Sequence, residues 1–309
     1  MLIEETLFGT VDKVADAIKR LQTFQPKDRP YWLAFSGGKD SCVILALAKM
    51  AGINYEAHYN VTSVDPPELV RFIKREYPDV SFDIQHDKDG KPITMWSLIR
   101  KNTIPPTQIA RYCCKDLKES TGKGTVTITG VRWAESVNRK RNQGVVLVSN
   151  HAKEGVFENI GKQDKRNRGI ILNDDNDEAR RAVEMCYRTH KTLVNPIIDW
   201  EDEDVWEFIH KYNVPYCELY GKGYTRIGCI GCPMKNTSER LGDFERYPKY
   251  KDNYIRSFEK MIENMKKRGT VGRKFDNGQE VFDWWLRLKK DETPTDMVGL
   301  LDEEDDLFF

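Results

Sequence analysis

One short segment near the N-terminus has the composition of a phosphate-binding loop. It reads Ser36-Gly37-Gly38-Lys39-Asp40-Ser41. The segment follows the apolar run Tyr31–Phe35 and precedes the apolar run Cys42–Met50, so we expect a strand, this loop and a helix in that order. Glycines allow a tight turn and leave room for an approaching oxyanion, which the N–H groups at the start of a helix attract.

The polar side chains of this loop suit the same chemistry. Lys39 brings a positive charge, and Ser36 and Ser41 can donate to phosphate oxygens. Asp40 is suited either to hold a magnesium ion or to cap the helix. The spacing matches neither the Walker A motif nor the dinucleotide motif G-x-G-x-x-G, and an ordinary tight turn is the alternative. The segment resembles the SGGxDS signature of the PP-loop ATP pyrophosphatases, which implies cleavage of ATP between its α- and β-phosphates.

Four of the seven cysteines form two pairs that could bind a metal. Cys113 and Cys114 are adjacent, and Cys229 and Cys232 form a C-x-x-C motif. Four thiolates suit a tetrahedral zinc ion or a cubane iron–sulfur cluster. Four reduced, buried thiols or a disulfide are the alternatives. An odd number of cysteines in a chain without a recognisable signal peptide favours metal or redox chemistry over a disulfide framework.

The surroundings of these cysteines resemble the phosphoadenylylsulfate/adenylylsulfate reductase family, a branch of the PP-loop proteins. The similarity covers roughly residues 30–235. It is carried by segments that follow one another in the family's order: Tyr112–Lys118, Ile128–Arg132, Glu135-Ser136, Asn195–Trp200, Asp204–Trp206, Pro215-Tyr216, Leu219-Tyr220, Gly223-Tyr224 and the segment around Cys229.

This resemblance implies roles for particular residues. The adenylylsulfate-reducing members bind one 4Fe–4S cluster through a Cys-Cys pair and a later C-x-x-C, here Cys113, Cys114, Cys229 and Cys232. The family also implies that Gly130 and Arg132 contact the nucleotide or its anion, and that Asp65 lies near the nucleotide. Zinc is the alternative occupant of the cysteines.

The sequence departs from the reductases at the position of their attacking thiol. In that family a motif like Glu-Cys-Gly-(Ile/Leu)-His near the C-terminus supplies it, whereas here no cysteine follows Cys232 and no histidine follows His210. The reductases also tend to have a degraded phosphate loop, and here the loop is intact. Both departures favour ATP as the ligand. A reductase that takes its thiol from Cys42, Cys186, Cys217 or a partner protein is the first alternative.

Composition excludes several classes of protein. Lys and Arg together number 49, as do Asp and Glu, so the whole chain has no cationic field for nucleic acid, although a local patch is still open. The apolar fraction of 39% is too high for a disordered chain. The longest apolar run, Cys42–Ala48, is far shorter than the ~20 residues that span a bilayer. We therefore expect a cytoplasmic protein without a membrane partner.

Strands alternate with helices on both sides of the phosphate loop. Further strands are predicted at Tyr55–Val61, Ser81–Gln85 and Thr125–Val131, and helices at 11–22, Glu68–Glu76 and Asp202–Lys211. This alternation predicts an α/β fold with a doubly wound, mostly parallel sheet, of the adenine nucleotide α-hydrolase type. We expect the nucleotide-binding domain at 1–215, with a polar loop excursion at about 150–193. A smaller helical, cysteine-bearing domain follows at 216–309, with helices at 246–268 and 278–290 and an acidic tail.

The sequence therefore predicts an enzyme that binds ATP and Mg²⁺ and uses Lys39 and Asp40 to activate a substrate by adenylation, with release of pyrophosphate. The expected setting is sulfur transfer, such as DNA phosphorothioation or RNA thiolation. The acceptor is DNA, RNA or a small metabolite, and a cysteine desulfurase is an expected sulfur donor. A non-catalytic nucleotide- or nucleic-acid-binding iron–sulfur module is the second alternative. The oligomeric state stays open, a homo-oligomer included.

Overall fold

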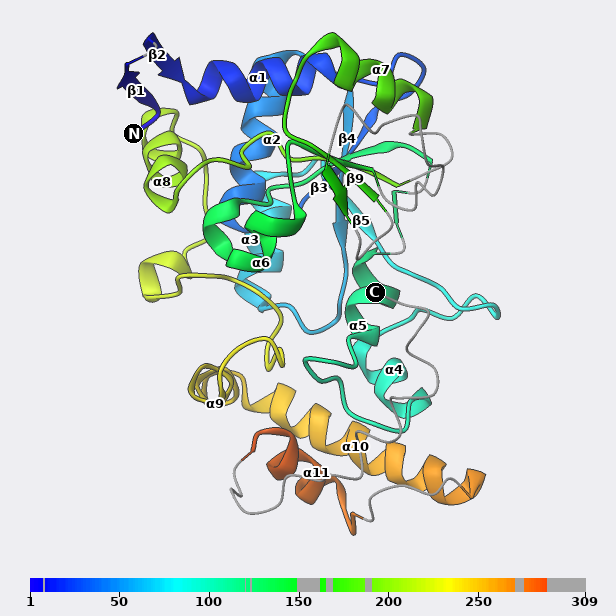
Figure 1. Cartoon of the computed structure of the whole chain (residues 1–309). Helices are drawn as coiled ribbons and strands as arrows, with labels where there is room; N and C mark the ends of the chain where they lie inside the picture. The colour runs from blue at the N-terminus through cyan, green and yellow to red at the C-terminus, as the bar shows by residue number, and fades with distance from the viewer. Residues whose placement is uncertain are drawn as a thin grey trace. The chain divides into compact units, whose positions relative to one another are not determined.

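The computed structural model divides the chain into two compact units, which we describe separately (Figure 1). Unit 1 comprises Met1–Tyr59, Pro67–Asp83 and Thr121–Ile227, and unit 2 comprises Asn60–Pro66, Ile84–Ser120 and Gly228–Phe309. These boundaries differ from the expected division at residue 215, because two segments of the N-terminal half belong to unit 2. The structure describes residues 1–7, 9–119, 121–122, 124–148, 162–164, 169–186, 191–269 and 275–287. The acidic tail and part of the polar excursion lie outside the described residues.

Unit 1 is built around a mostly parallel sheet, as the alternation of strands and helices predicted. Its described strands follow the order β5-β4-β3-β6-β10-β7-β9-β8. Their bounds are β3 (Tyr31–Ala34), β4 (Tyr55–Asn60), β5 (Ser81–Asp83), β6 (Val126–Ile128), β7 (Val146–Val148), β8 (Lys162–Asp164), β9 (Gly169–Leu172) and β10 (Thr192–Val194). β3 pairs in parallel with β4 and β6, and β6 pairs in parallel with β10.

Helices cover this sheet, and one of them begins directly at the phosphate loop. The bounds of those discussed below are α1 (Lys13–Thr23), α2 (Lys39–Ala51), α3 (Pro67–Glu76), α6 (Val137–Asn142) and α8 (Asp202–Lys211). α2 contacts both α1 and α8 and is buried on most of its surface, which explains its nearly continuous apolar sequence. It ends at Gly52, whose φ of 63° is the left-handed conformation that closes many helices.

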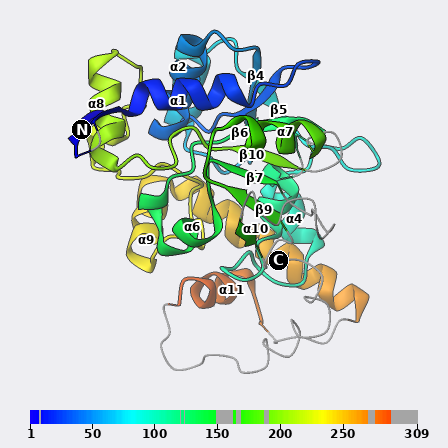
Figure 2. The same ribbon diagram turned by 45° about the horizontal axis from the view of Figure 1, so that its top comes forward.

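Two parts of unit 1 differ from the sequence prediction. A hairpin of β1 (Ile3–Thr6) and β2 (Gly9–Asp12) precedes α1, so the predicted helix begins two residues later than expected. The excursion at 150–193 contains β8, β9, β10 and the helix α7 (Asp177–Cys186) in its described part. β7, β8, β9 and β10 pair antiparallel, and Figure 2 shows β6, β10, β7 and β9 in succession. This segment therefore extends the sheet instead of forming only a loop.

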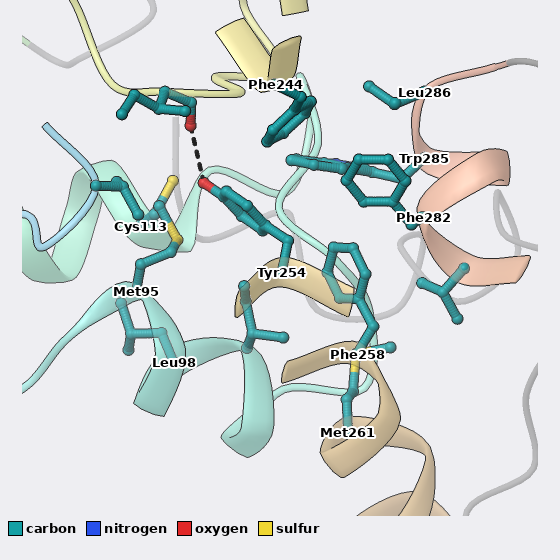
Figure 3. Packing of buried hydrophobic residues seen from close by; sticks show 14 of the residues in the cluster. Met95, Leu98, Cys113, Phe244, Tyr254, Phe258, Met261, Phe282, Trp285 and Leu286 are labelled. Atoms are coloured by element: carbon teal, nitrogen blue, oxygen red, sulfur yellow. Dashed lines mark hydrogen bonds between the residues drawn. The ribbon is translucent and has the colours of Figure 1, made fainter. Parts of the chain in front are cut away.

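Unit 2 is mostly helical, as expected for the C-terminal region. Its helices are α4 (Met95–Lys101), α5 (Tyr112–Cys114), a π-helical turn (Lys115–Glu119), α9 (Thr237–Arg246), α10 (Pro248–Arg268) and α11 (Gly278–Trp285). Aromatic side chains from three helices fill its core, namely Phe244, Tyr254, Phe258 and Trp285 (Figure 3). In the part of the chain that the structure describes, we find no helix with the length and apolarity to cross a membrane.

Candidate functional sites

The predicted strand–loop–helix turn lies at the carboxyl end of β3. Gly37 adopts a φ of 73°, and Gly38 is the residue that precedes the first turn of α2. A Cβ on Gly37 would lie 2.7 Å from methyl carbons of Leu69 and Ile73, so this position requires glycine for both conformation and space. Because Gly38 has no side chain to cap α2, the first N–H groups of the helix are left for other partners.

One of the first N–H groups of α2 finds its hydrogen-bond partner within unit 1. The Lys39 N–H donates to the hydroxyl of Tyr220 at 2.8 Å. The Ser41 hydroxyl donates to the Gly38 carbonyl at 2.8 Å and lies 3.2 Å from the exposed Ser36 hydroxyl. The two serines therefore shape the loop, and their predicted donation to phosphate oxygens stays a prediction.

Two cations and two carboxylates meet beside the loop. Lys39 Nζ lies 3.0 Å from Asp202 and 3.8 Å from Asp40. Arg132 donates from Nε to Asp40 at 2.7 Å and from Nη2 to Asp202 at 2.8 Å. Lys39 and Arg132 are buried, whereas the Asp202 side chain is 54% exposed. Burial alone would raise the pKa of Asp202, but the hydrogen bonds from Lys39 and Arg132 hold it below its ordinary value.

The sheet topology explains why these distant residues meet. β3 and β6 are parallel neighbours, so the loops after their carboxyl ends open at the same edge of the sheet. β4 lies on one side of β3 and β6 on the other, which makes this the point where α/β sheets commonly bind ligands. A Cβ on Gly130 would lie 3.1 Å from Asp40 Cβ, so the loop after β6 approaches the phosphate loop closely. The structure thus brings together Lys39, Asp40, Gly130 and Arg132.

Sequence reasoning missed two members of this site. Asp202 was recognisable only as the first residue of a predicted helix, and Tyr220 only as part of a family segment. Tyr220 packs edge-on against Trp206 of α8, with ring centroids 5.2 Å apart, and this contact holds its hydroxyl at the loop. No local sequence pattern predicts that Asp202 or Tyr220 belongs to this site, because each joins it through a tertiary contact with Lys39.

All four predicted ligand cysteines belong to unit 2. Cys113 and Cys114 lie in α5, and Cys229 and Cys232 lie in a turn before α9. Lys118 Nζ donates to Cys229 Sγ at 3.4 Å. Cys229 Sγ also lies 3.7 Å from a carboxylate oxygen of Asp65. The residue that was expected near the nucleotide therefore lies beside the C-x-x-C pair.

The cysteine side chains act on one another electrostatically. A hydrogen bond from Cys113 lowers the pKa of Cys114, and the same bond raises the pKa of Cys113. Negative charge on Cys229 or Cys232 would raise the pKa of Cys113 further. Burial raises the pKa of Cys229 to about 11, against the opposing effect of Lys118.

The surroundings of the thiols fit an anionic centre. Within the described residues, no group of three His, Cys, Asp or Glu side chains stands in metal-binding geometry, and the cysteines with described side chains are free. Three basic side chains nevertheless act on these cysteines: Arg111 on Cys114, Lys118 on Cys229, and Arg240 on Cys232. Nη2 of the buried Arg240 has no hydrogen-bond partner among the described residues. Four thiolates around zinc or an oxidised cubane cluster would carry the negative charge that these cations match.

Fold and loop together define an α/β protein of the PP-loop type. Residues 30–235 match the model of the phosphoadenosine phosphosulfate reductase domain. An adenosine 5'-phosphosulfate reductase of Oceanobacillus iheyensis is 40% identical over 210 residues, which are 64% of this chain and 69% of that protein. The chain therefore belongs to the phosphoadenosine phosphosulfate reductase family.

Other relatives are longer or more distant. An uncharacterized protein of Methanocaldococcus jannaschii is 29% identical over 229 residues, covering 72% of this chain but 46% of that protein. The chain thus spans about half the length of the first curated relatives it matches. Among solved structures, a phosphoadenylyl-sulfate reductase from Candida auris in a phosphate complex has a TM-score of 0.40 at 13% identity, over 69% of this chain and 87% of that one. The FMN adenylyltransferase of Candida glabrata with FAD and pyrophosphate has a TM-score of 0.41 at 14% identity, over 71% and 62%.

Proposed function

We propose that this chain binds ATP at the phosphate loop and activates an acceptor by adenylation, as one step of a sulfur transfer. The observation that carries the proposal is the loop itself. Gly37 is left-handed, Gly38 leaves the first turn of α2 without a side-chain cap, and the buried Lys39 stands at that turn. Backbone N–H groups and a lysine ammonium are the donors that a pyrophosphate group needs.

The side chains around the loop take distinct roles in this reaction. Lys39 and the first N–H groups of α2 bind the β- and γ-phosphates, and Arg132 orients Asp40 through its 2.7 Å hydrogen bond. That bond engages Oδ1 of Asp40, while Oδ2 lies 3.8 Å from Lys39 Nζ, too far for a hydrogen bond. Oδ2 therefore suits a magnesium ion, which would neutralise charge on the departing pyrophosphate.

The reaction balances with ATP and one nucleophile. An oxygen of the acceptor attacks the α-phosphorus, the bond between that phosphorus and the bridging oxygen of the β-phosphate breaks, and the electron pair leaves with pyrophosphate. The acceptor is then adenylated and open to displacement of AMP by a sulfur nucleophile. A cysteine desulfurase is the proposed sulfur donor, and DNA, RNA or a small metabolite is the proposed acceptor.

The cysteines of unit 2 would hold an iron–sulfur cluster, or zinc instead. The ligands would be Cys113, Cys114, Cys229 and Cys232, and the cations Arg111, Lys118 and Arg240 would offset the charge of the group. A 4Fe–4S cluster supplies electrons or a sulfur-binding iron, and zinc supplies structural stability.

A second candidate function is reduction of adenylylsulfate, and the Oceanobacillus iheyensis relative favours it. That reaction needs a thiolate that attacks the sulfate sulfur. Of the candidate thiols with described side chains, burial raises the pKa of Cys42 to about 12 and also raises the pKa of Cys217, and both are fully buried. Both are therefore poor nucleophiles, and the side chain of Cys186 lies outside the described residues.

One pair of assays separates the two functions. We expect ATP to yield AMP and pyrophosphate in the presence of acceptor and Mg²⁺, and Asp40→Ala to abolish pyrophosphate release while the protein stays folded. Unchanged release in that variant would remove Asp40 from the mechanism. We expect no sulfite from adenylylsulfate or its 3'-phosphorylated form with thioredoxin and dithiol. Robust sulfite release by the wild type, lost in Cys217→Ser, would instead establish the reductase.

A further inference from the structure

Arg240 of α9 is a buried cation beside the C-x-x-C turn. Its side chain is 5% exposed. Nε donates to the Gly231 carbonyl at 3.3 Å, and Nη1 donates to the Trp285 carbonyl at 2.9 Å. The guanidinium carbon lies 3.9 Å from the centre of the Trp285 ring. These contacts fix the guanidinium against the backbone of the C-x-x-C turn at Gly231, the residue before Cys232.

The positive charge of Arg240 lacks an anion of its own. The nearby carboxylate of Asp243 accepts from Lys235 at 2.7 Å and from the Gly231 N–H at 2.8 Å, so it is already engaged. Arg287 adds a second positive charge in the vicinity. Burial lowers the pKa of Arg240 to about 10, and the favourable effects of Tyr254, Cys232 and Asp243 offset this only in part.

A purely structural role explains only part of this arrangement. The bonds to Gly231 and Trp285 would make Arg240 a clamp between the C-x-x-C turn and α11, and those bonds use Nε and Nη1. Nη2 has no hydrogen-bond partner among the described residues. A buried donor and a buried charge are costly unless they find an acceptor and an anion, and Arg240 is bonded to the carbonyl of Gly231, the residue before Cys232 in the C-x-x-C turn.

We propose that Arg240 is a positioning residue for the cysteine centre, whose guanidinium supplies countercharge to an anionic group bound by four thiolates. The proposal rests on the cofactor named under the proposed function. It concerns a residue beyond the 30–235 range that the family model matches. A 4Fe–4S cluster and a zinc ion bound by four thiolates would both need this positive countercharge, and the experiment below distinguishes them.

The two occupants give different measurable consequences. A nearby positive charge favours the reduced form of a cluster, because reduction adds an electron, so loss of that charge shifts the midpoint potential to more negative values. A zinc ion held by four thiolates also leaves a net negative charge, so loss of the cation weakens zinc binding.

The test compares neutral and charged replacements at this position. Full-length wild type, Arg240→Gln and Arg240→Lys are purified anaerobically, and iron and zinc are counted. The exposed Arg246 of the same helix supplies the matched control, Arg246→Gln. With a cluster, we expect Arg240→Gln to change the oxidised-to-reduced ratio at a fixed potential about tenfold, which is about 59 mV. Arg240→Lys and Arg246→Gln should stay at the wild-type potential. With zinc, Arg240→Gln should bind it about tenfold more weakly in chelator competition.

An unshifted potential or an unchanged zinc affinity in Arg240→Gln would overturn the proposal, as would an equal shift in Arg246→Gln.

A measurement on the intact side chain covers the case in which Arg240→Gln does not fold. In protein that carries both Arg111→Lys and Arg287→Lys and is grown with ¹⁵N-arginine, pulsed EPR of the reduced cluster should show coupling to an arginine nitrogen, and its absence would equally refute the role. Protein without iron or zinc would refute the cofactor and Arg240 together, whereas failure of ATP cleavage alone would leave this test intact.

Discussion

The phosphate loop of unit 1 and the cysteine cluster of unit 2 handle charge in opposite ways. At the loop, two cations face two carboxylates, and the half-exposed Asp202 bridges Lys39 and Arg132. At the cysteines, three basic side chains, Arg111, Lys118 and Arg240, face the thiols and the nearby carboxylate of Asp65. A site whose charges are already paired suits a ligand that arrives, displaces an internal anion and departs. A site with surplus positive charge suits an anionic group that stays.

The largest expected effect is therefore loss of the resident group. Cys229→Ser should remove a ligand that Lys118 and Asp65 also contact, and the brown colour of anaerobically purified protein should disappear, from about four irons per chain to none. Cys217→Ser is the matched control, because it makes the same substitution at a buried cysteine that belongs to unit 1. Equal iron content in the two variants would end the assignment of Cys229. A colourless wild type with one zinc per chain would replace the cluster by zinc.

The next effect concerns ATP, the ligand that is expected to bind at the phosphate loop and depart. Lys39→Ala removes a charge-assisted contact to phosphate, so the dissociation constant for ATP should rise by about tenfold to a hundredfold. Iron or zinc content should stay unchanged, since Lys39 belongs to unit 1 and the cysteines to unit 2. Calorimetric titration with ATP measures the first quantity and elemental analysis the second. Loss of metal together with ATP binding would show that Lys39 is needed at both sites.

The sequence anticipated the parts of these sites that depend on local signals. The bounds of α8 at Asp202–Lys211 are those predicted, and α2 and β3 follow from an apolar run on each side of Gly37 and Gly38. β7, β8 and β9 escaped prediction, because they are short strands stabilised by antiparallel partners within polar sequence. Asp202, Tyr220 and Arg240 escaped as site residues for a related reason. Each acts through a contact that only the folded chain creates, and no spacing rule connects them to the loop or the cysteines.

The glycines of the loop test whether its shape is required. Gly37→Ala places a Cβ at a φ of 73° and 2.7 Å from methyl carbons of Leu69 and Ile73. Gly52→Ala is the matched control, with a φ of 63° but no atom within 4 Å of the added carbon. Both variants should lose about 1 kcal/mol to backbone strain, and Gly37→Ala about 1–3 kcal/mol more to overlap, as measured by urea unfolding. Equal destabilisation would mean that Leu69 and Ile73 move aside without cost.

The smallest effect probes the charge pairing itself. In Asp202→Asn, Lys39 and Arg132 keep their places through Asp40, the Arg132 bond to the Trp200 carbonyl and burial, but they lose the carboxylate that bridges them. Pyrophosphate without metal should then bind more tightly, because it no longer competes with an internal anion. Since Asp202 is 54% exposed, the gain should be about fivefold, the value of a solvent-screened ion pair near 1 kcal/mol. Glu203→Gln removes a neighbouring charge from the same first turn of α8 and should change binding little. Weaker pyrophosphate binding in Asp202→Asn would show that Asp202 holds the two cations in position for phosphate. Paired charge at the loop would then not be a sign of a ligand that departs, and only the cysteines would support the comparison.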